Sequence, residues 1–168
     1  EIAAMIEIVA GRRSHDCNRG LHERKRYVCK VFVGHLYVFR YEKGRGPVVQ
    51  IAEAIGDRDP ALRVGRAMRE LEFDWLEEPL PQAGYAGYPE LRRRLAVPLA
   101  GGESLTTRAA AYELLQRGCF DIIQPDVSIC GGIAECVFIG ELARLAGVRT
   151  IPHCWAGGVV LAATCLLY

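Results

Sequence analysis

The sequence predicts an α/β fold, a partial (β/α) barrel with parallel strands, from two observations. From about residue 60, short apolar runs of strand length alternate with stretches of helical periodicity, which is typical of βαβ units and a parallel sheet. Four of these runs stop at a polar residue: Glu77, Glu103, Asp126 and His153, separated by 26, 23 and 27 residues. Because equivalent strand ends of a parallel barrel meet at one mouth, we expect these four side chains to lie close together.

Helical spacing of apolar residues and capping signals predict the helices. The first covers Pro60–Leu71, with Asp59 as the expected N-cap and Pro60 in the first turn. Three further helices are expected over 89–95, 107–117 and 132–146. Gly118 and Gly147 are expected to close the last two. The apolar segment Gly157–Tyr168 is too short to span a membrane and is expected to be a core helix.

The strands are expected between these helices. One strand ends at Glu77, and three others are expected over 97–101, 120–124 and 148–152. Between Tyr27 and His153 five or six strands are expected in all. An eight-unit barrel takes about 200 to 250 residues, so this chain of 168 residues predicts a partial barrel of the TIM-barrel type that lacks some strands. Its open sheet edges predict a homo-oligomer.

The first fifty residues carry weaker patterns. Residues 1–26 include a polar cluster without periodicity and are expected to form a poorly defined N-terminal segment, which leaves 27–168 as the barrel domain. Tyr27–Val33 is a plausible strand. Tyr37–Gly46 follows neither the helix nor the strand period, and 48–55 fits either a strand or the end of a helix.

Composition excludes several classes of protein. The net charge is +1 and 51% of residues are hydrophobic, which is ordinary for a globular domain and gives no broad electrostatic case for binding nucleic acid or an anionic membrane. No apolar run reaches a membrane span of ~18 residues, and the start of the chain lacks a signal-peptide pattern. We therefore expect a cytoplasmic protein.

Cysteine and histidine spacing argues against a zinc site or a disulfide framework. The seven cysteines are odd in number and no pair has the spacing of a zinc or redox motif, so buried thiols in a reducing compartment are expected. His15, Asp16, Cys17 and His22 lie close in sequence, but their spacing fits no metal-ligand motif. A solvated loop explains them better.

Four motifs carry a resemblance to a known family. They are 74–81, which contains Trp75 to Pro79, then Gly101 to Leu105, then Asp121 to Asp126 followed by Gly131-Gly132, and finally Pro152 to Trp155. In this order and spacing they closely resemble the barrel domain of the enolase superfamily, within its mandelate racemase/muconate lactonizing group. The resemblance covers about residues 59–166. It implies abstraction of the proton α to a carboxylate, with the enediolate stabilised by Mg²⁺.

The resemblance also implies roles for individual residues. Glu77 and Glu103 would be carboxylate ligands of Mg²⁺, which prefers oxygen ligands in an octahedral shell. His153 would be a general base on one side of the substrate, and Asp126 would hydrogen-bond the imidazole ring and fix its tautomer. The first lysine of the pair on the opposite side would be Lys30.

The chain departs from the family pattern at two places. Phe32 stands where the second lysine of the family should be, and Phe cannot transfer a proton. No strand carries the family's first metal-binding aspartate. Glu53 is one candidate for the missing ligand. Alternatively, 51–57 resembles the helix before that strand and 59–62 the helix after it, so that the whole strand has been deleted.

Three functions follow from these observations. The first is a Mg²⁺-dependent enzyme that abstracts the α-proton of a hydroxy-carboxylate, most plausibly a sugar-acid dehydratase, since racemisation needs a base on each face. The second is a truncated, catalytically inactive family member or fragment. The third is an unrelated α/β binding module. The expected partner under the first is a small-molecule carboxylate, a sugar acid, with no nucleic acid and no membrane.

Overall fold

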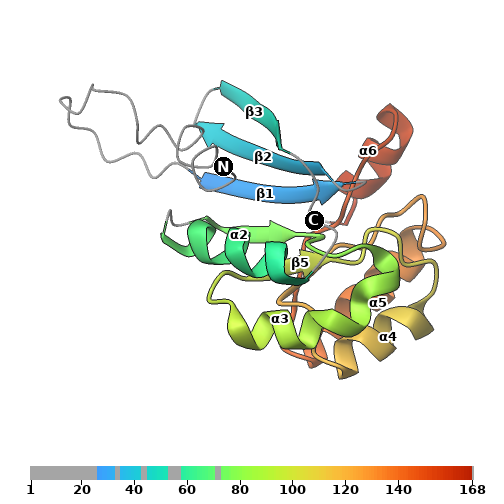
Figure 1. The fold of residues 1–168 in the computed structure, drawn as a ribbon. Helices are drawn as coiled ribbons and strands as arrows, with labels where there is room; N and C mark the ends of the chain where they lie inside the picture. The colour runs from blue at the N-terminus through green and yellow to red at the C-terminus, as the bar shows by residue number, and fades with distance from the viewer. Residues whose placement is uncertain (1–25, 33–34, 43–44, 53–57, 71–72, 168) are drawn as a thin grey trace. The chain divides into compact units, whose positions relative to one another are not determined.

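The computed structural model describes residues 26–32, 35–42, 45–52, 58–70 and 73–167. The chain divides into two compact units, the first made of Glu1–Pro81 and Arg93–Pro98, the second of Gln82–Arg92 and Leu99–Tyr168. The elements, in chain order and labelled as in Figure 1, are β1 (Arg26–Phe32), β2 (His35–Glu42), β3 (Arg45–Ala52), α2 (Arg58–Glu70), β4 (Trp75–Glu77), the 3₁₀ segment η1 (Gln82–Gly87), α3 (Tyr88–Arg94), β5 (Leu99–Gly101), α4 (Arg108–Gln116), β6 (Ile122–Ile123), α5 (Ile133–Leu145), β7 (Arg149–Thr150) and α6 (Gly158–Cys165).

The first unit contains a four-stranded sheet in the order β3-β2-β1-β4. Strand β2 runs antiparallel to both of its neighbours, β1 and β3, as Figure 1 shows, and β1 pairs in parallel with β4. The parallel register places Lys30 opposite Glu77. Helix α2 packs closely on Leu95, because a Cβ added to Gly65 would lie only 2.6 Å from the Leu95 Cδ1. Gly65 is therefore required for that approach.

The second unit contains three parallel strands, with β6 between β5 and β7. Each connection is a helix, as a parallel sheet requires. Helix α4 begins at an N-cap, Thr107, whose side chain accepts a hydrogen bond from the Ala110 N–H at 3.1 Å. The chain leaves α4 through Gly118, which adopts the left-handed φ of 67° that favours glycine.

Two kinds of contact stabilise the second unit. Tyr85, Tyr88 and Phe120 form a cluster in which each ring meets the other two edge to face, with centroids 5.2 to 5.5 Å apart. Phe120 and Tyr88 are fully buried, so this cluster forms part of the core. Helices α4 and α5 are bridged at the surface, where Arg108 pairs with Glu135 and its guanidinium lies 3.9 Å from the Phe138 ring centroid.

The structure confirms the predicted α/β alternation from residue 58 onward. Every predicted helix and strand of that region is present, although the strands are shorter than predicted. Asp59 is not the N-cap of the first helix: α2 already includes Arg58, so Asp59 lies in the first turn, where its charge favours the helix dipole. The domain boundary at residues 26 and 27 remains a prediction.

The structure corrects the interpretation of residues 37–55. Tyr37–Gly46 shows no strand period, yet most of it belongs to β2, and 45–52 forms β3, which decides between the strand and the helix end for that part. The β1–β2 and β2–β3 pairs are antiparallel, whereas the β1–β4, β5–β6 and β6–β7 pairs are parallel. Ile51 and Ala52 lie in β3, so the resemblance of 51–57 to a helix is wrong for these two residues, and 53–57 lie outside the described residues.

The last predicted helix is present but is not a core helix. Within α6 and its flanks, Val159 is 86% exposed, Leu161 54% and Leu166 75%, and Thr164 is the buried residue of the helix.

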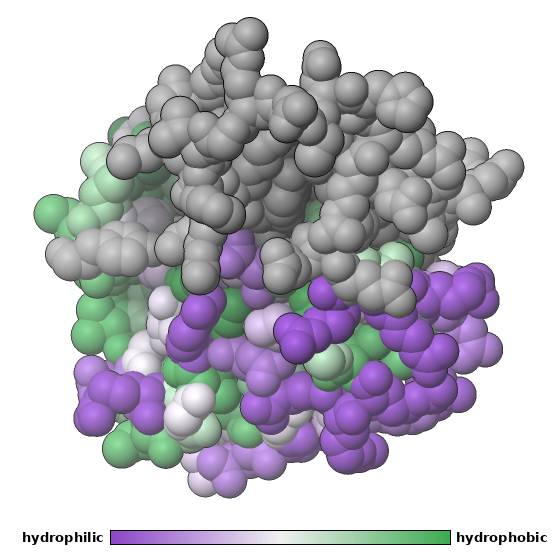
Figure 2. All heavy atoms as spheres, turned by 90° about the vertical axis from the view of Figure 1, so that its left-hand side faces the viewer, coloured by the Kyte–Doolittle hydropathy of each residue, from purple (hydrophilic) through white to green (hydrophobic). Residues whose placement is uncertain are grey.

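On the face shown in Figure 2, the coloured surface is largely hydrophilic with hydrophobic residues interspersed. Across the described part of the chain, every helix falls short of the length and apolarity that crossing a bilayer demands.

We expect Phe120→Ala to lower the free energy of unfolding by about 3–5 kcal/mol, because it removes a buried ring and leaves a cavity. Chemical denaturation of the full chain measures this loss. Tyr112→Ala is the matched control, since Tyr112 is 52% exposed on α4 and its loss should cost less than about 1 kcal/mol. Equal losses in both variants would contradict this description of the core.

The cysteines should react with alkylating reagents in the order of their exposure. Cys165 is exposed, whereas Cys136 is buried and burial raises the pKa of its thiol to about 12. At pH 8 only about one Cys136 thiol in ten thousand is then the reactive thiolate. Mass spectrometry after brief iodoacetamide treatment should find Cys165 modified and Cys136 modified only after unfolding. Modification of both at equal rates would show that Cys136 is not buried.

Candidate active site

A regular ladder of main-chain hydrogen bonds brings Asp126 and His153 together. The N–H groups of Arg149, Ile151 and His153 donate to the carbonyls of Asp121, Ile123 and Pro125, each at 3.0 or 3.1 Å. The pairing therefore continues beyond β6 and β7, as a parallel bridge between Asp126 and His153. The predicted spacing of 27 residues is the offset of this register, which confirms that these two strand ends meet.

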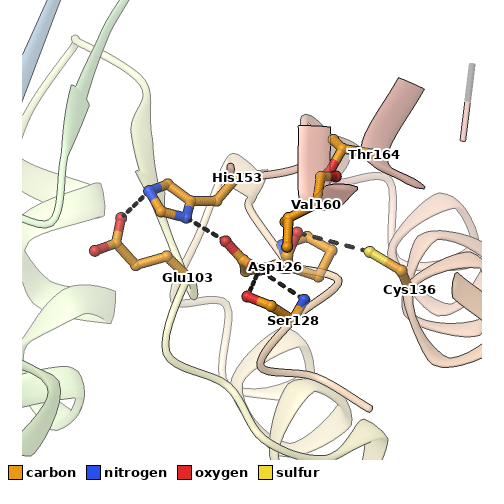
Figure 3. A network of polar contacts seen from close by, with 8 residues as sticks. Glu103, Asp126, Ser128, Cys136, His153, Val160 and Thr164 are labelled. Carbon is orange, nitrogen blue, oxygen red and sulfur yellow. Dashed lines mark hydrogen bonds and ion pairs between the residues drawn. The ribbon is translucent and has the colours of Figure 1, made fainter. Parts of the chain in front are cut away.

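The Asp126 carboxylate is divided between two partners. Its Oδ1 accepts hydrogen bonds from the Ser128 N–H at 2.8 Å and from the Ser128 hydroxyl at 2.5 Å. Its Oδ2 lies 2.8 Å from the His153 Nδ1. Because Ser128 holds one oxygen, the other is fixed toward the imidazole (Figure 3). The side chain is nearly inaccessible, with 2% exposed.

Hydrogen bonding outweighs burial at Asp126. Burial by itself would raise the pKa of this carboxyl, because it disfavours the charged form. The hydrogen bonds from Ser128 and His153, and the charge of the imidazole, act in the opposite direction and hold the pKa of Asp126 below its usual range. Asp126 is therefore an ionised acceptor at neutral pH, as an orienting partner of a histidine must be.

The His153 ring lies between two carboxylates. Figure 3 shows Asp126 on the side of Nδ1 and Glu103 on the side of Nε2, and the Glu103 Oε2 is 3.3 Å from the Nε2. A neutral imidazole carries a single N–H, so both contacts are hydrogen bonds only when the ring is protonated on both nitrogens. The arrangement can therefore hold a proton on Nε2 and release it toward a bound ligand.

Glu103 owes its position to a turn after β5. Gly102 has a φ of 101° and accepts a hydrogen bond from the Leu105 N–H at 3.2 Å. A Cβ at Gly102 would lie 3.0 Å from the Leu105 Cδ1 and 3.3 Å from the Ile123 Cγ1. Both the positive φ and this close packing therefore favour glycine at position 102. The carboxylate of Glu103, which is 8% exposed, is thereby aimed at His153.

Glu77 ends β4 in the first unit and is 6% exposed. Its Oε2 accepts a hydrogen bond from the Trp75 indole N–H at 3.0 Å. The next residue, Glu78, has a φ of 45°. Residues other than glycine rarely adopt this left-handed backbone conformation. The strand therefore stops at Glu77, as predicted, and the chain turns away directly after it.

Two predicted site residues remain, Lys30 and Glu53. Lys30 is in β1, opposite Glu77 in the parallel register. Because β1 is hydrogen-bonded directly to β4, no further parallel strand separates the strand of Lys30 from that of Glu77. This is the arrangement expected if the third barrel strand is deleted. Glu53, the other candidate for a third metal ligand, lies outside the described residues.

Mg²⁺ prefers oxygen ligands such as carboxylates, and Glu77 and Glu103 are carboxylates. The number is smaller than the family resemblance implies: in the part of the chain that is described, no three His, Cys, Asp or Glu side chains form a group that could hold a metal. Glu103 is instead engaged with His153. The described residues therefore supply two carboxylates of the predicted set, one in each unit.

Two residues that flank Asp126 were not predicted as candidates from the sequence. Ser128 holds Asp126, and the signal for it is the Asp-x-Ser spacing of a turn in which the aspartate accepts from the N–H two residues ahead. Gln124 is 4% exposed and its Oε1 has no hydrogen-bond partner among the described residues. Its sequence position, two residues before Asp126, is the only signal.

Comparison with known proteins supports these observations. A family model described as enolase C-terminal domain-like matches residues 48–168. The chain is 33% identical to the D-galactarolactone cycloisomerase of Agrobacterium fabrum over 82% of its own length and 39% of that protein. It is 43% identical to the L-rhamnonate dehydratase of Saccharopolyspora erythraea over 58% of its own length and 25% of that protein. The chain thus spans less than two fifths of these relatives.

Solved structures agree with the fold. A mandelate racemase/muconate lactonizing enzyme-like protein from Rubrobacter xylanophilus superposes with a TM-score of 0.64 at 34% identity, covering 66% of this chain and 28% of that one. A mandelate racemase/muconate lactonizing protein from Paracoccus denitrificans, complexed with magnesium, gives a TM-score of 0.62 at 31% identity, covering 65% of this chain and 29% of that one.

The predicted fold class and the family resemblance are therefore both confirmed. The chain belongs to the enolase superfamily, as part of the C-terminal barrel domain of its mandelate racemase/muconate lactonizing enzyme group.

Proposed function

We propose that this chain contributes the proton-transfer side of an enzyme that removes the α-proton of a polyhydroxy carboxylate, as a sugar-acid dehydratase does. The observation that carries the proposal is the His153 ring held between Asp126 and Glu103. The names of the relatives, a galactarolactone cycloisomerase and dehydratases of rhamnonate and arabinonate, support the substrate class.

The residues of the chain would divide the work as follows. The His153 Nε2 takes or returns the proton, while Asp126, hydrogen-bonded to Nδ1 at 2.8 Å, orients the ring and stabilises its protonated form. Ser128 keeps Asp126 in place. Lys30 would serve the opposite face of the substrate, and its position beside Glu77 in the sheet supports that role.

Glu77 and Glu103 would hold Mg²⁺, with Glu53 the candidate for a third carboxylate. When bound, the cation would neutralise the negative charge that develops on the substrate carboxylate as the α-proton leaves. Both glutamates are buried, and a buried carboxylate favours a nearby positive charge. A cytoplasmic location and a homo-oligomeric assembly remain predictions from the sequence, as does the absence of nucleic-acid and membrane partners.

The proton transfer can be measured without the complete dehydration. In D₂O the full chain with Mg²⁺ should exchange the α-proton of a sugar acid, followed by ¹H NMR. His153→Asn should slow this exchange by about 10²–10⁴-fold, the usual contribution of a positioned acid or base. His15→Asn serves as the control with the same chemical change. Exchange that is absent from the wild-type chain would favour an inactive family member or fragment.

Mg²⁺ binding can be tested separately by isothermal titration calorimetry. The wild-type chain should give a saturable heat at millimolar Mg²⁺, and Glu103→Gln should weaken or abolish it, because one of two anionic ligands is lost. Glu113→Gln is the control: this glutamate is on α4, pairs with Arg117 and is 68% exposed. A saturable heat that Glu103→Gln leaves unchanged would remove Glu103 from the metal site.

Acid should remove the stabilisation that Asp126 provides. Because the pKa of Asp126 is lowered in the folded protein, its ionised form stabilises the fold above the unfolded value of about 3.9. That contribution is lost as the pH falls through the folded pKa. The unfolding free energy of the wild type, minus that of Asp126→Asn, should be constant just above pH 5 and shrink toward pH 2. A difference that grows in acid would contradict the lowered pKa.

A further inference from the structure

The side chain of Gln124 is buried with an unused hydrogen-bond acceptor. It is 4% exposed, and its Oε1 has no partner among the residues that the structure describes. A buried polar atom left without a hydrogen bond costs about 1–3 kcal/mol. Such atoms are few in native proteins and indicate a functional role or a bound group.

The hydrogen-bond ladder determines which face of the sheet Gln124 occupies. The Gln124 N–H donates to the Gly101 carbonyl at 2.9 Å, and the Ile151 N–H donates to the Ile123 carbonyl at 3.0 Å. The hydrogen bonds to the two neighbouring segments alternate in this way as far as the Pro125 carbonyl, which accepts from the His153 N–H. The backbone is therefore extended over 123–126, and the side chains at 124 and 126 point to the same face. Gln124 is therefore one pleat below Asp126 on that face.

The opposite face is the one that α5 covers. Thr150 approaches Gly140 of α5, since a Cβ at Gly140 would lie 3.8 Å from the Thr150 Oγ1. Thr150 is the register partner of Ile123, so Ile123 faces α5 and its neighbour Gln124 faces away from it. His153, bridged to Asp126, is on the same side as Gln124.

We propose that Gln124 is a ligand-binding residue, whose Oε1 accepts a hydrogen bond from a hydroxyl group of a polyhydroxy carboxylate bound at Asp126 and His153. This inference rests on the proposed function and adds a specificity residue to it. A carboxamide oxygen repels a carboxylate and attracts a donor, and the hydroxyl groups of such a ligand are its donors. A site that loses a buried hydrogen bond when the hydroxyl is missing discriminates strongly against the analogue.

The experiment compares Gln124→Met with wild type in two measurements on the full chain. Without ligand, denaturation should find Gln124→Met at least as stable as wild type, because the apolar side chain removes an unsatisfied acceptor. In calorimetry, its affinity for a six-carbon aldonate should fall roughly tenfold, the loss of one hydrogen bond. Its affinity for 2-hydroxyhexanoate, which has the same chain length but lacks the other hydroxyls, should not change.

Two further variants make the result specific. Gln116→Met makes the same change at an exposed position on α4 and should alter neither stability nor affinity. Gln124→Leu repeats the apolar replacement with a different shape. Loss of stability in both Gln124 variants would overturn the proposal, because the oxygen would then bind a structural water. Unchanged discrimination between the two acids would overturn it as well.

The outcome separates this inference from the proposed function. If the wild-type chain binds the aldonate with the predicted dependence on Gln124 but exchanges no α-proton, the inference stands and the proposed function fails. If it exchanges the proton and Gln124→Met discriminates as wild type does, only the inference fails. A wild-type chain that binds no aldonate contradicts both.

Discussion

The register of one pair of parallel segments determines the candidate site. Main-chain hydrogen bonds from 149–153 to 121–125 continue for two steps beyond the short strands β6 and β7. They align Asp126 with His153, so that the two side chains leave the same face at the same height. A shift of one residue would turn one of them to the helical side. The ring of His153 is then within 3.3 Å of Glu103 as well.

The ring of His153 consequently contacts two carboxylates, one at each ring nitrogen. Asp126 is anchored by Ser128 through one oxygen and faces Nδ1 with the other, while Glu103 approaches Nε2. The imidazole therefore has a carboxylate oxygen within reach of each of its two nitrogens. A cation taken up by Glu103 would weaken one of these contacts.

The sequence predicted the second unit well because its signals are local. Caps such as Thr107 and glycines such as Gly118 mark helix ends wherever the helix packs. It failed for β2, since the mixed aromatic and charged residues of 37–46 show no period, and a strand between two partners is fixed by its neighbours. The helix α6 was predicted, but its burial was not. Apolar composition indicates what a helix can bury, whereas the exposure of the helix depends on what packs against it.

The four candidates Glu77, Glu103, Asp126 and His153 could be chosen from the sequence because each ends an apolar run, but the contacts that they make could not be predicted. Ser128 reaches Asp126 through a turn, and the face that Gln124 occupies follows from the hydrogen-bond ladder. No spacing of single residues reveals either. Similarly, the direct pairing of β1 with β4 could be expected only as one of two alternatives for the missing strand. Glu53 was the other, and its part of the chain lies outside the described residues.

The most direct test of the account is the state of the His153 ring in solution. Nitrogen-15 NMR of the histidines at neutral pH distinguishes a ring that carries a hydrogen-bonded proton on Nδ1 from one that exchanges freely. The account predicts that one of the four histidines shows a protected Nδ1–H, and that Asp126→Asn removes this signal. Four freely exchanging rings in the wild-type chain would contradict it, because the parallel register would then not join Asp126 to His153.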